Sequence, residues 1–374
     1  MFVIRQTRID DLPILLKLAR MVHFINLPAD KDIITGKIER SEQSFSGKIE
    51  NPTQGLYMFA IEDDETGNLL GTSQIIAKMG TPESPNTYFE VGTREFYADD
   101  LRQGCRHTTL KLGAERDGGS EVGGLILQPS FRGHPSRLGK SLSLIRFHYI
   151  GLHRERFADE LIAEMMAPLT HEGTNALWEY LGRRFINLTY DEADRLSTKS
   201  KAFILDLMPR EEIYVSLLPP EARIIIGQVG KDTEPAKAML EKMGFEYRNH
   251  IDPFDGGPHL HARTGDVTVI RDTRRVTLKG ACGKGQAGGE ALVSFESESG
   301  FRALRTELAL TGGNGDILLP KPVMEALQAE PGATVGLTLL ANPNRGSKRG
   351  SGAKGKGNAG SKRSKGRKTA GQGA

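Results

Sequence analysis

The sequence predicts a mixed α/β protein built from three parts. In residues 1–271, apolar runs of strand length alternate with segments whose apolar residues recur at helical spacing. In residues 272–341 the pattern changes to short strands separated by glycine turns, which predicts a small, barrel-like β domain. Residues 342–374 are rich in Lys, Arg, Gly and Ser and contain few apolar side chains, so we expect a disordered tail.

Length and cysteine content narrow the class of protein. At 374 residues the chain exceeds the size at which a single hydrophobic core stops growing, which favours two domains. Two cysteines, Cys105 and Cys282, cannot form a disulfide framework, and this suits a reducing compartment. The N-terminus carries charges at once, and no run of about 18 apolar residues occurs. We therefore expect a soluble, cytoplasmic protein without a membrane partner.

The charge is distributed unevenly along the chain. The tail holds ten of the 50 Lys and Arg residues and none of the 47 acidic residues. This leaves 40 basic against 47 acidic residues in 1–341, a net charge of −7. The tail could therefore bind RNA, DNA or another polyanion by counterion release. The alternative is a solvating tail, or one that contacts the acidic body of its own chain.

The first elements follow from local patterns. Residues 2–5 predict a strand, and Asp10 or Asp11 then caps a helix with Pro13 in its first turn. Two apolar strands follow within residues 55–80. The turn at residues 65–67 joins them, which predicts a β-hairpin.

Four later segments complete the predicted secondary structure. Residues 137–160 predict a long helix, and residues 161–166 a buried strand. An amphipathic helix is expected over 173–185, and another over 234–243 with Gly244 as its C-cap before a strand at 245–247. Residues 316–341 predict a strand, a short helix, a tight turn and a strand.

The stretch "GGLILQPSFRGHPSRLGKSLSLIRF" (residues 123–147) suggests a cradle for phosphates. A nucleotide-binding P-loop needs four residues between its first glycine and the Gly-Lys-Ser, whereas five separate Gly133 from Gly139. Pro135 also removes an amide donor. The pattern is therefore not a P-loop, but a strand followed by a turn and a helix N-terminus still favours an anion.

Several blocks of the sequence resemble a known family. They include "LIAEMM", "ALWEYLGRRF", "KAFILDLMP", "IIGQVG", "EPAKAMLEKMGFEYRN" and "HIDPFDGGP", all between residues 161 and 258. In this order and spacing they are similar to the arginine N-succinyltransferases. The turn "FRGHPSRLGKSL" resembles the pyrophosphate loop of the wider acyl-CoA N-acyltransferase superfamily, to which that family belongs. The resemblance covers about residues 2–341 and omits the tail.

This resemblance implies a fold and a reaction. The fold expected for residues 1–271 is the α/β acyl-CoA N-acyltransferase fold. The reaction expected is transfer of a succinyl group from succinyl-CoA to the α-amine of arginine, or of ornithine, in arginine catabolism. No metal is expected.

The acyl-CoA site is expected along the strand, turn and helix described above. The family's acyl-CoA contact corresponds to Leu125. Backbone amides at the end of this strand can hold a thioester carbonyl, while the following loop holds the pyrophosphate. The residues predicted to bind acyl-CoA are Leu125, Ile126, Leu127, Arg132, Gly133, Leu138, Gly139, Lys140 and Ser141.

Gly230 stands where the family has its proton-donating histidine, just after "IIGQV". Loss of an acid of this kind allows a slow enzyme, an enzyme with a relocated acid, or a non-catalytic acyl-CoA binder. Candidates for a relocated acid are Glu164, His259 and His261. Glu164 lies within an apolar strand, where a carboxylate is costly unless it is paired or functional. The two histidines alternate along a predicted strand, so they could be an acid or a metal pair, or simply lie on a solvated face.

The segment "HIDPFDGGP" could receive a cationic substrate. Asp252 and Asp255 supply charge, and Gly256 and Gly257 allow close approach of the backbone. The alternative is a tight turn that needs its glycines and aspartates for local hydrogen bonds.

A second class of function is also open. An inactive acyltransferase fold could sense acyl-CoA, or bind nucleic acid through its basic tail. Such a nucleic-acid binder should lose affinity steeply with added salt and should need the tail, whereas an enzyme should depend on neither.

Overall fold

The computed structural model describes residues 1–21, 27–82, 84–170, 172–197, 200–283, 286–311 and 315–340. The predicted tail and its polyanion site lie outside the described residues. The strands are β1 (Phe2–Gln6), β2 (Leu56–Asp63), β3 (Asn68–Ile76), β4 (Asn86–Ala98), β5 (Gln103–Glu115), β6 (Ser120–Leu127), β7 (Glu160–Glu164), β8 (Ile213–Tyr214), β9 (Glu246–Ile251), β10 (Pro258–Arg263), β11 (Arg274–Ala281), β12 (Gly289–Ser297), β13 (Gly300–Leu310), β14 (Ile317–Leu319) and β15 (Thr334–Leu339). The α-helices are α1 (Leu12–Met21), α2 (Lys31–Phe45), α3 (Leu138–Leu152), α4 (Arg183–Phe185), α5 (Tyr190–Ser197), α6 (Ala202–Leu207), α7 (Pro220–Arg223), α8 (Glu234–Lys242), α9 (Thr268–Asp272) and α10 (Lys321–Leu327).

These strands form one hydrogen-bonded sheet within the described residues. Its order is β12-β15-β11-β14-β13-β1-β2-β3-β6-β7-β10-β9-β4-β5-β8. Strand β2 shows why the sheet lies between two layers of helices. Alternate residues of β2 point to opposite faces, and both sets are buried. Tyr57 and Phe59 pack in the core beneath α3, while Met58 and Ala60 pack against α1 and α2.

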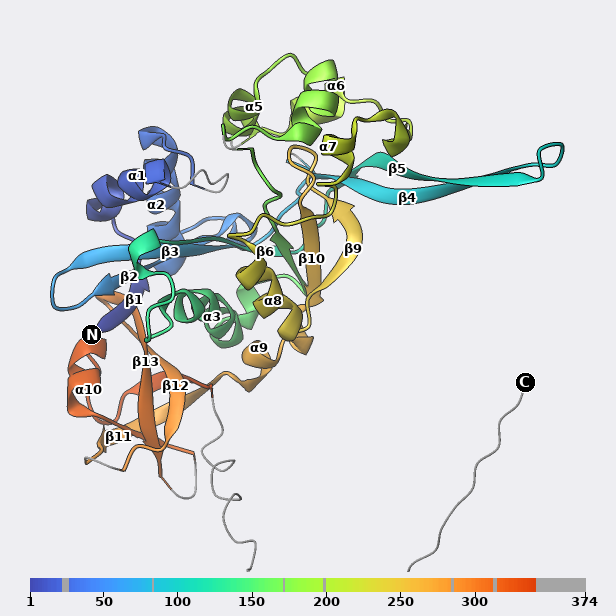
Figure 1. Cartoon of the computed structure of the whole chain (residues 1–374). Helices are drawn as coiled ribbons and strands as arrows, with labels where there is room; N and C mark the ends of the chain where they lie inside the picture. Colours follow the sequence, from blue (N-terminus) through green and yellow to red (C-terminus); the bar gives the residue numbers. More distant parts are fainter. Residues whose placement is uncertain are drawn as a thin grey trace, which may run out of the picture.

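The helices divide between the two faces of the sheet (Figure 1). Helices α3, α8 and α9 contribute to the core on one face. On the opposite face, α1 and α2 cover the part of the sheet around β2 and β3. Helices α5 and α6 belong to a further core on that side, in which Trp178 stacks on Phe254 at 5.2 Å between ring centroids. The mixed α/β architecture predicted from the sequence is confirmed.

The C-terminal strands close into a five-stranded barrel. Starting at β11, each strand pairs with the next in the order β11-β14-β13-β12-β15, and β15 pairs again with β11. The predicted barrel-like part is therefore confirmed, with α10 between β14 and β15 as the sequence pattern predicts. The predicted domain boundaries, at residues 271 and 341, stay predictions.

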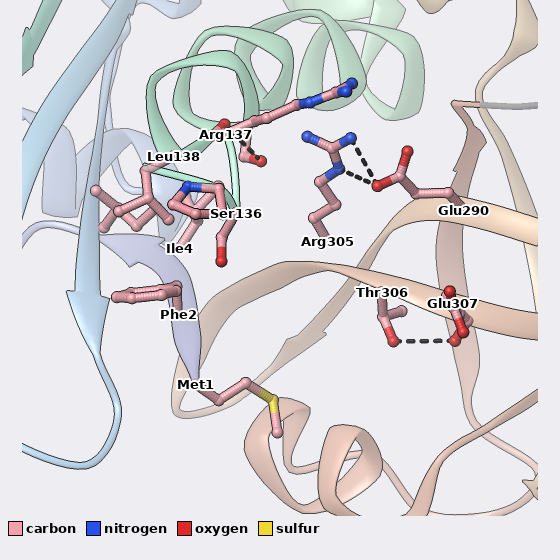
Figure 2. A pocket seen from close by; sticks show the side chains of 13 residues that line it. Met1, Phe2, Ile4, Ser136, Arg137, Leu138, Glu290, Arg305, Thr306 and Glu307 are labelled. Atoms are coloured by element: carbon pink, nitrogen blue, oxygen red, sulfur yellow. Dashed lines mark hydrogen bonds and ion pairs between the residues drawn. The ribbon is translucent and has the colours of Figure 1, made fainter. Parts of the chain in front are cut away.

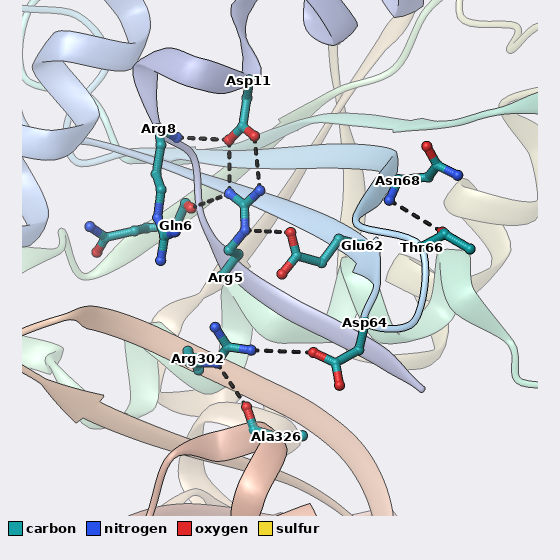
Figure 3. A network of polar contacts seen from close by, with 10 residues as sticks. All are labelled: Arg5, Gln6, Arg8, Asp11, Glu62, Asp64, Thr66, Asn68, Arg302 and Ala326. Atoms are coloured by element: carbon teal, nitrogen blue, oxygen red, sulfur yellow. Dashed lines mark hydrogen bonds and ion pairs between the residues drawn. The ribbon is translucent and has the colours of Figure 1, made fainter.

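The barrel is joined to the rest of the chain through β1. Ile4 of β1 pairs with Ala303 of β13, and Arg5 pairs with Arg302. The Arg5 side chain is buried and forms a two-pronged contact with Asp11, with both distances 2.8 Å, and a 2.6 Å contact with Glu62 (Figure 3). Arginine suits this place because its planar fork matches carboxylates on two sides.

A long hairpin leaves the body of the molecule (Figure 1). Strands β4 and β5 pair over 13 positions, but β4 meets β9 only at Phe89 and Glu90. The outer part is therefore a two-stranded ribbon. Its tip exposes Tyr97 and Leu101, which are 66% and 71% accessible. We call residues 91–108 the arm; no local pattern in the sequence pointed to it.

The observed helices and strands confirm one sequence prediction and correct another. The hairpin within residues 55–80 is confirmed as β2 and β3. The helix predicted over 137–160 is wrong in length, because α3 ends at Leu152, where His153 leaves helical geometry with φ of −132° and a 3₁₀ turn follows at Arg154–Arg156. Among the described helices, none is both long enough and apolar enough to cross a bilayer.

Candidate active site

Strands β6 and β7 run side by side at one end and then separate. Their parallel pairing ends at Glu121 and Ile162. Beyond this pair β6 continues to Leu127, whereas β7 ends at Glu164. Parallel strands that part in this way present backbone N–H and C=O groups between them, where a substrate can hydrogen-bond.

A bulge in β6 lies at the point of separation. The register between β3 and β6 shifts between Gly123 and Ile126, since β6 has one residue more than its neighbour there. Gly124 occupies the bulge with φ of 59°, and a Cβ atom at this position would lie 2.7 Å from Cγ of Gln74. Glycine is therefore required, and the bulge turns the backbone before Leu125 away from the β3 ladder.

The loop over residues 128–137 leads from β6 into α3. Its last residue, Arg137, is the N-cap of α3, adopts a left-handed conformation with φ of 51°, and provides no side-chain cap. The N–H groups of the first helical turn thus keep their capacity to bind an anion. Arg132 in this loop is exposed and lies 3.1 Å from Asp232, just after Gly230. This contact brings the loop next to the segment that precedes α8.

The nine residues predicted to bind acyl-CoA form one continuous unit of strand, loop and helix. Leu125 and Leu127 are half-buried against the core beneath α3, whereas Ile126 faces the core of α1 and α2. Lys140 is exposed on the first turn of α3, and Ser141 is buried with its hydroxyl donating to the Arg137 carbonyl at 3.4 Å. The structure therefore brings the nine together, although their side chains point in different directions.

A cavity of about 550 Å³ opens beside the start of α3 (Figure 2). The sheet contributes Phe2 and Ile4 to its wall, and the loop contributes Ser136 and Arg137. The barrel contributes Arg305, whose Nε and Nη2 atoms contact Glu290 at 2.7 and 2.6 Å. The cavity thus lies between the helix and the barrel.

A buried polar cluster lies on the sheet face opposite α3. One ligand atom each from Glu164, Asp252 and His259 falls within 4.8 Å of the others. The His259 Nε2 atom is 3.9 Å from the Glu164 carboxylate. Neither Glu164 Oε1 nor His259 Nε2 has a hydrogen-bond partner among the described residues. The spacing would suit a metal ion, but the positive charge of Lys201 already acts on Glu164 and Asp252.

Charges set the protonation of this cluster. Burial by itself would lower the pKa of Lys201, but Glu164 and then Asp252 outweigh it and raise the pKa above its ordinary value. Burial tends to raise the pKa of Glu164, yet Lys201 and His259 hold it below its ordinary value. Burial and then Glu164 raise the pKa of Asp252 to about 6. Glu164 is therefore ionised at neutral pH, with Lys201 as its counter-charge.

The turn formed by "DPFDGGP" uses most of its polar atoms internally. Asp255 accepts the N–H groups of Gly257 at 2.7 Å and Ala167 at 2.9 Å, one on each carboxylate oxygen. A Cβ atom on Gly257 would lie 1.9 Å from the Met165 carbonyl oxygen. Asp255, Gly256 and Gly257 thus hold the turn against the end of β7. Asp252 accepts two backbone N–H groups on one oxygen and keeps the other for the cluster.

The prediction that the two histidines of β10 lie on a solvated face is wrong. His259 and His261 do lie on one face of the strand, but they are 1% and 6% exposed. That face is covered, so burial lowers the pKa of each imidazole to about 4 and keeps both rings neutral. His259 pairs in register with Glu164 on β7, whereas His261 lies beside Glu160 at 3.7 Å.

Gly230 sits against the end of β7. Its N–H donates to the Met166 carbonyl at 3.0 Å. A Cβ atom built on it would lie 3.3 Å from the Ala167 carbonyl oxygen, and its φ is not positive. A side chain at this position would need only a small shift of its neighbours. The position therefore borders both the separated strands and the loop that carries Arg132.

Comparison with known proteins shows to which family the chain is related. The family model described as arginine N-succinyltransferase beta subunit matches residues 2–269. Arginine N-succinyltransferase of Enterobacter sp. (strain 638) is 35% identical over 347 residues, covering 91% of this chain and 98% of that protein. The chain belongs to the arginine N-succinyltransferase family. The protein of the same name from Escherichia coli O139:H28 (strain E24377A / ETEC) is 34% identical over 345 residues, covering 91% of this chain and 98% of that protein.

A solved structure supports the membership. The arginine/ornithine succinyltransferase subunit AI from Pseudomonas aeruginosa superposes with a TM-score of 0.79 and 31% sequence identity. The match covers 91% of this chain and 99% of that chain. This member of the arginine N-succinyltransferase family therefore shares its fold with nearly the whole length of the Pseudomonas aeruginosa subunit.

Several residues of the candidate site in this member of the arginine N-succinyltransferase family were not predicted from the sequence. Glu121 is 2% exposed, and burial and then Glu164 raise its pKa to about 7. A carboxylate in the apolar run "EVGGLIL" was a signal, of the same kind as the one that pointed to Glu164. Lys201 and Asn86, which lie 3.5 Å apart, carried no such signal because both reach the cluster from distant segments.

Proposed function

We propose that this chain transfers the succinyl group of succinyl-CoA to the α-amine of arginine, a reaction of arginine catabolism. Family membership supports the reaction, since the relatives are named arginine N-succinyltransferase. The observation that carries the proposal is the separation of β6 from β7, with an uncapped helix N-terminus on one side and a buried acidic cluster on the other.

The fold proposed for residues 1–271 is the acyl-CoA N-acyltransferase fold. Three features support it: the bulge at Gly124, the parting of β6 and β7, and the loop that enters α3 without a side-chain cap. Together they offer an extended acyl-CoA a strand edge for its thioester arm and a helix N-terminus for its phosphates.

The proposed acyl-CoA site follows this unit from strand to helix. The Leu125 N–H would donate to the thioester carbonyl, next to Ile126 and Leu127. The N–H groups of Gly133, Leu138, Gly139 and Lys140 would face the pyrophosphate, with Ser141 closing the first turn. Arg132 and Lys140 add positive charge from exposed positions, where they can reach a phosphate without the cost of burial.

The proposed acceptor site is the buried cluster. The amine nitrogen attacks the thioester carbon, the carbon–sulfur bond breaks, and CoA leaves as a thiolate. The proton lost by the amine goes to a nearby base. Glu164 suits this role because it is ionised and has a free oxygen, and the neutral His259 beside it can share the proton. His261 is a weaker candidate, since it faces Glu160 rather than Glu164.

Because residue 230 is glycine, which has no proton to donate from a side chain, the leaving thiolate takes its proton from another source. A positioned acid contributes about 10²- to 10⁴-fold to a rate, so its loss slows such an enzyme without abolishing turnover. A thiolate leaves more readily than an amine, and the oxyanion contact and proximity of the reactants remain.

The test is thiol release from succinyl-CoA with arginine present, confirmed by the mass of N-succinylarginine. The Arg132→Ala, Lys140→Ala double variant should raise the Kd for succinyl-CoA at least about tenfold, since two phosphate contacts are lost. The matched control replaces Arg223 and Lys321, two exposed basic residues of other helices. Equal affinity of both double variants and the natural protein would overturn this acyl-CoA site, and absence of product would overturn the activity.

A second function is proposed for the tail on the strength of its ten basic residues and absence of acids. Nucleic acid binding should disappear when the chain is truncated after residue 341 and should weaken steeply with salt. Binding that survives truncation would contradict this role of the tail.

A further inference from the structure

Helix α5 packs against the segment that carries Asp252, and two of its polar side chains lie on one face of the helix. Tyr190 and Asp194 are four residues apart, so they lie one above the other on the helix. Tyr190 is 6% exposed, and neither its hydroxyl nor Asp194 Oδ1 has a hydrogen-bond partner among the described residues. Unpartnered polar atoms in such a place are costly unless a ligand pairs with them.

Asp252 connects this corner with the site of the reaction. Tyr190 of α5 packs in one core with Ile251 and Phe254, on either side of Asp252. Asp252 also lies within the group formed with Glu164 and His259. The corner is therefore continuous with the proposed acceptor site, on the side turned towards α5.

Acidic groups outnumber basic groups around the corner. The groups that act on Asp194 or Tyr190 are Asp191 of α5, Asp252 and Asp255 of the turn, Lys201 before α6 and Lys37 of α2. Glu121 and Glu164 of the sheet act on Asp252 or on the two lysines. Two lysines thus face five further carboxyl groups and Asp194 itself. A cationic guest would improve this balance, whereas an anionic guest would worsen it.

We infer that Tyr190, Asp194 and Asp252 form the subsite for the side chain of the acceptor, and that it takes a guanidinium or ammonium group. The inference rests on the proposed function and extends it to specificity. A guanidinium presents five N–H donors, which match the unpartnered oxygens of Asp194 and Tyr190 and a carboxylate oxygen of Asp252. The subsite therefore selects cationic amino acids and rejects neutral ones of the same shape.

The same corner makes binding depend on pH. Burial, and then the charge of Asp252, raise the pKa of Asp194 to about 7, so part of the free protein carries this carboxyl in protonated form at neutral pH. A bound cation favours the carboxylate, and the proton is released. Affinity for a cationic acceptor should therefore increase as the pH rises from about 6 to 8.

The experiment measures binding by calorimetry in the presence of CoA, which fills the donor site without reaction. Arginine should bind the natural protein at least about tenfold more tightly than citrulline, its uncharged isostere. Asp194→Asn should weaken arginine about 10- to 100-fold, leave citrulline nearly unchanged, and flatten the pH dependence of arginine affinity. Glu192→Gln, on the exposed side of the same helix, is the matched control and should bind like the natural protein.

A second variant tests the subsite independently, and the results distinguish failure of the subsite from failure of the proposed activity. Tyr190→Phe removes a hydroxyl without changing charge, so it should weaken arginine and citrulline to unequal extents if the corner holds the side chain, even if Asp194→Asn fails to fold. Equal binding of arginine and citrulline by the natural protein, or an unchanged preference in both variants, would overturn the subsite. Selective arginine binding without any product would support the subsite and contradict the proposed activity.

Discussion

His148 of α3 and Thr338 of β15 are joined by a 2.7 Å hydrogen bond across the contact between helix and barrel. The other ring nitrogen of His148 lies 2.7 Å from the Ser294 hydroxyl of β12. The imidazole is fully buried. One side chain therefore connects the helix that begins at the proposed acyl-CoA loop with two strands of the barrel.

Replacing His148 with leucine should destabilise the protein. Two buried hydroxyls would lose a partner, and each such loss costs about 1–3 kcal/mol, so we expect about 2–6 kcal/mol less free energy of unfolding. Denaturant unfolding at pH 7.5 measures it. His107→Leu, on the arm, is the control and should show a smaller change. Similar losses in both variants would mean that the bridge contributes nothing.

Acid should weaken the same bridge. Burial lowers the pKa of His148 to about 3, whereas the unfolded chain has the ordinary value of about 6.5. Between these values only the unfolded state takes up the proton, so stability falls as the pH falls through this window. At pH 5 the loss from this group should be about 2 kcal/mol relative to pH 7.5. The acid-induced loss should shrink in His148→Gln; an undiminished loss would assign it to other groups.

Arg5→Met should be costly for a different reason. Asp11 and Glu62 would stay largely buried without their partner, and breaking a buried ion pair in this way costs about 3–5 kcal/mol. Arg8→Met is the matched control, since the Arg8 side chain is exposed. Thermal unfolding should show a clear drop for Arg5→Met alone. A drop of the same size in both would show that the network does not stabilise β1.

Gly257→Ala should disrupt the turn that borders the cluster. The added methyl would lie 1.9 Å from a backbone oxygen, which nothing flexible can relieve, so we expect a loss of about 1–3 kcal/mol or more. Gly265→Ala meets nothing within 4 Å and serves as control. Denaturant unfolding of both proteins makes the comparison, and unchanged stability in Gly257→Ala would contradict the tight packing of this turn.

Gly230→His should raise the rate of succinyl transfer. The position tolerates a Cβ atom with a small shift, and an acid placed there contributes up to about 10²- to 10⁴-fold. Steady-state kinetics at saturating substrates measures the gain. Gly230→Ala separates the effect of the imidazole from that of the Cβ atom. Equal rates in the two variants would show that the natural protein does not lack this acid.

The sequence predicts what depends on neighbouring residues. The β2–β3 hairpin, α8 and the barrel elements from Ile317 onward follow from turn residues and periodicity, and the structure contains them. The pairing of Ile4 with Ala303 joins residues almost three hundred positions apart, which no local pattern encodes. The arm was not predicted because its strands do not alternate between apolar and polar residues. Neither face of the ribbon is covered, so both faces carry polar side chains.

The residues of the candidate site also fall into those that the local sequence predicts and those that only tertiary packing brings together. Glu164 could be singled out because a carboxylate in an apolar strand needs a reason. Tyr190 and Asp194 lie in α5 and Lys201 lies just before α6, in segments with ordinary patterns, and only packing of these segments over the sheet brings the three side chains to the cluster. The loop over 128–137 was identified from its glycines, but its contact with Asp232 depends on tertiary structure.

The position of β1 in the sheet affects how the chain folds during its synthesis. Its residues are synthesised well before those of β13, yet one of its two edges is completed only by β13. At about 5–20 residues per second, synthesis of the roughly 300 intervening residues takes about 15–60 s. During that time the β13-facing edge of β1 has no strand beside it, and such an edge can pair with another nascent chain. Slow translation should therefore favour aggregation of this protein, and a chaperone that shields β1 should oppose it.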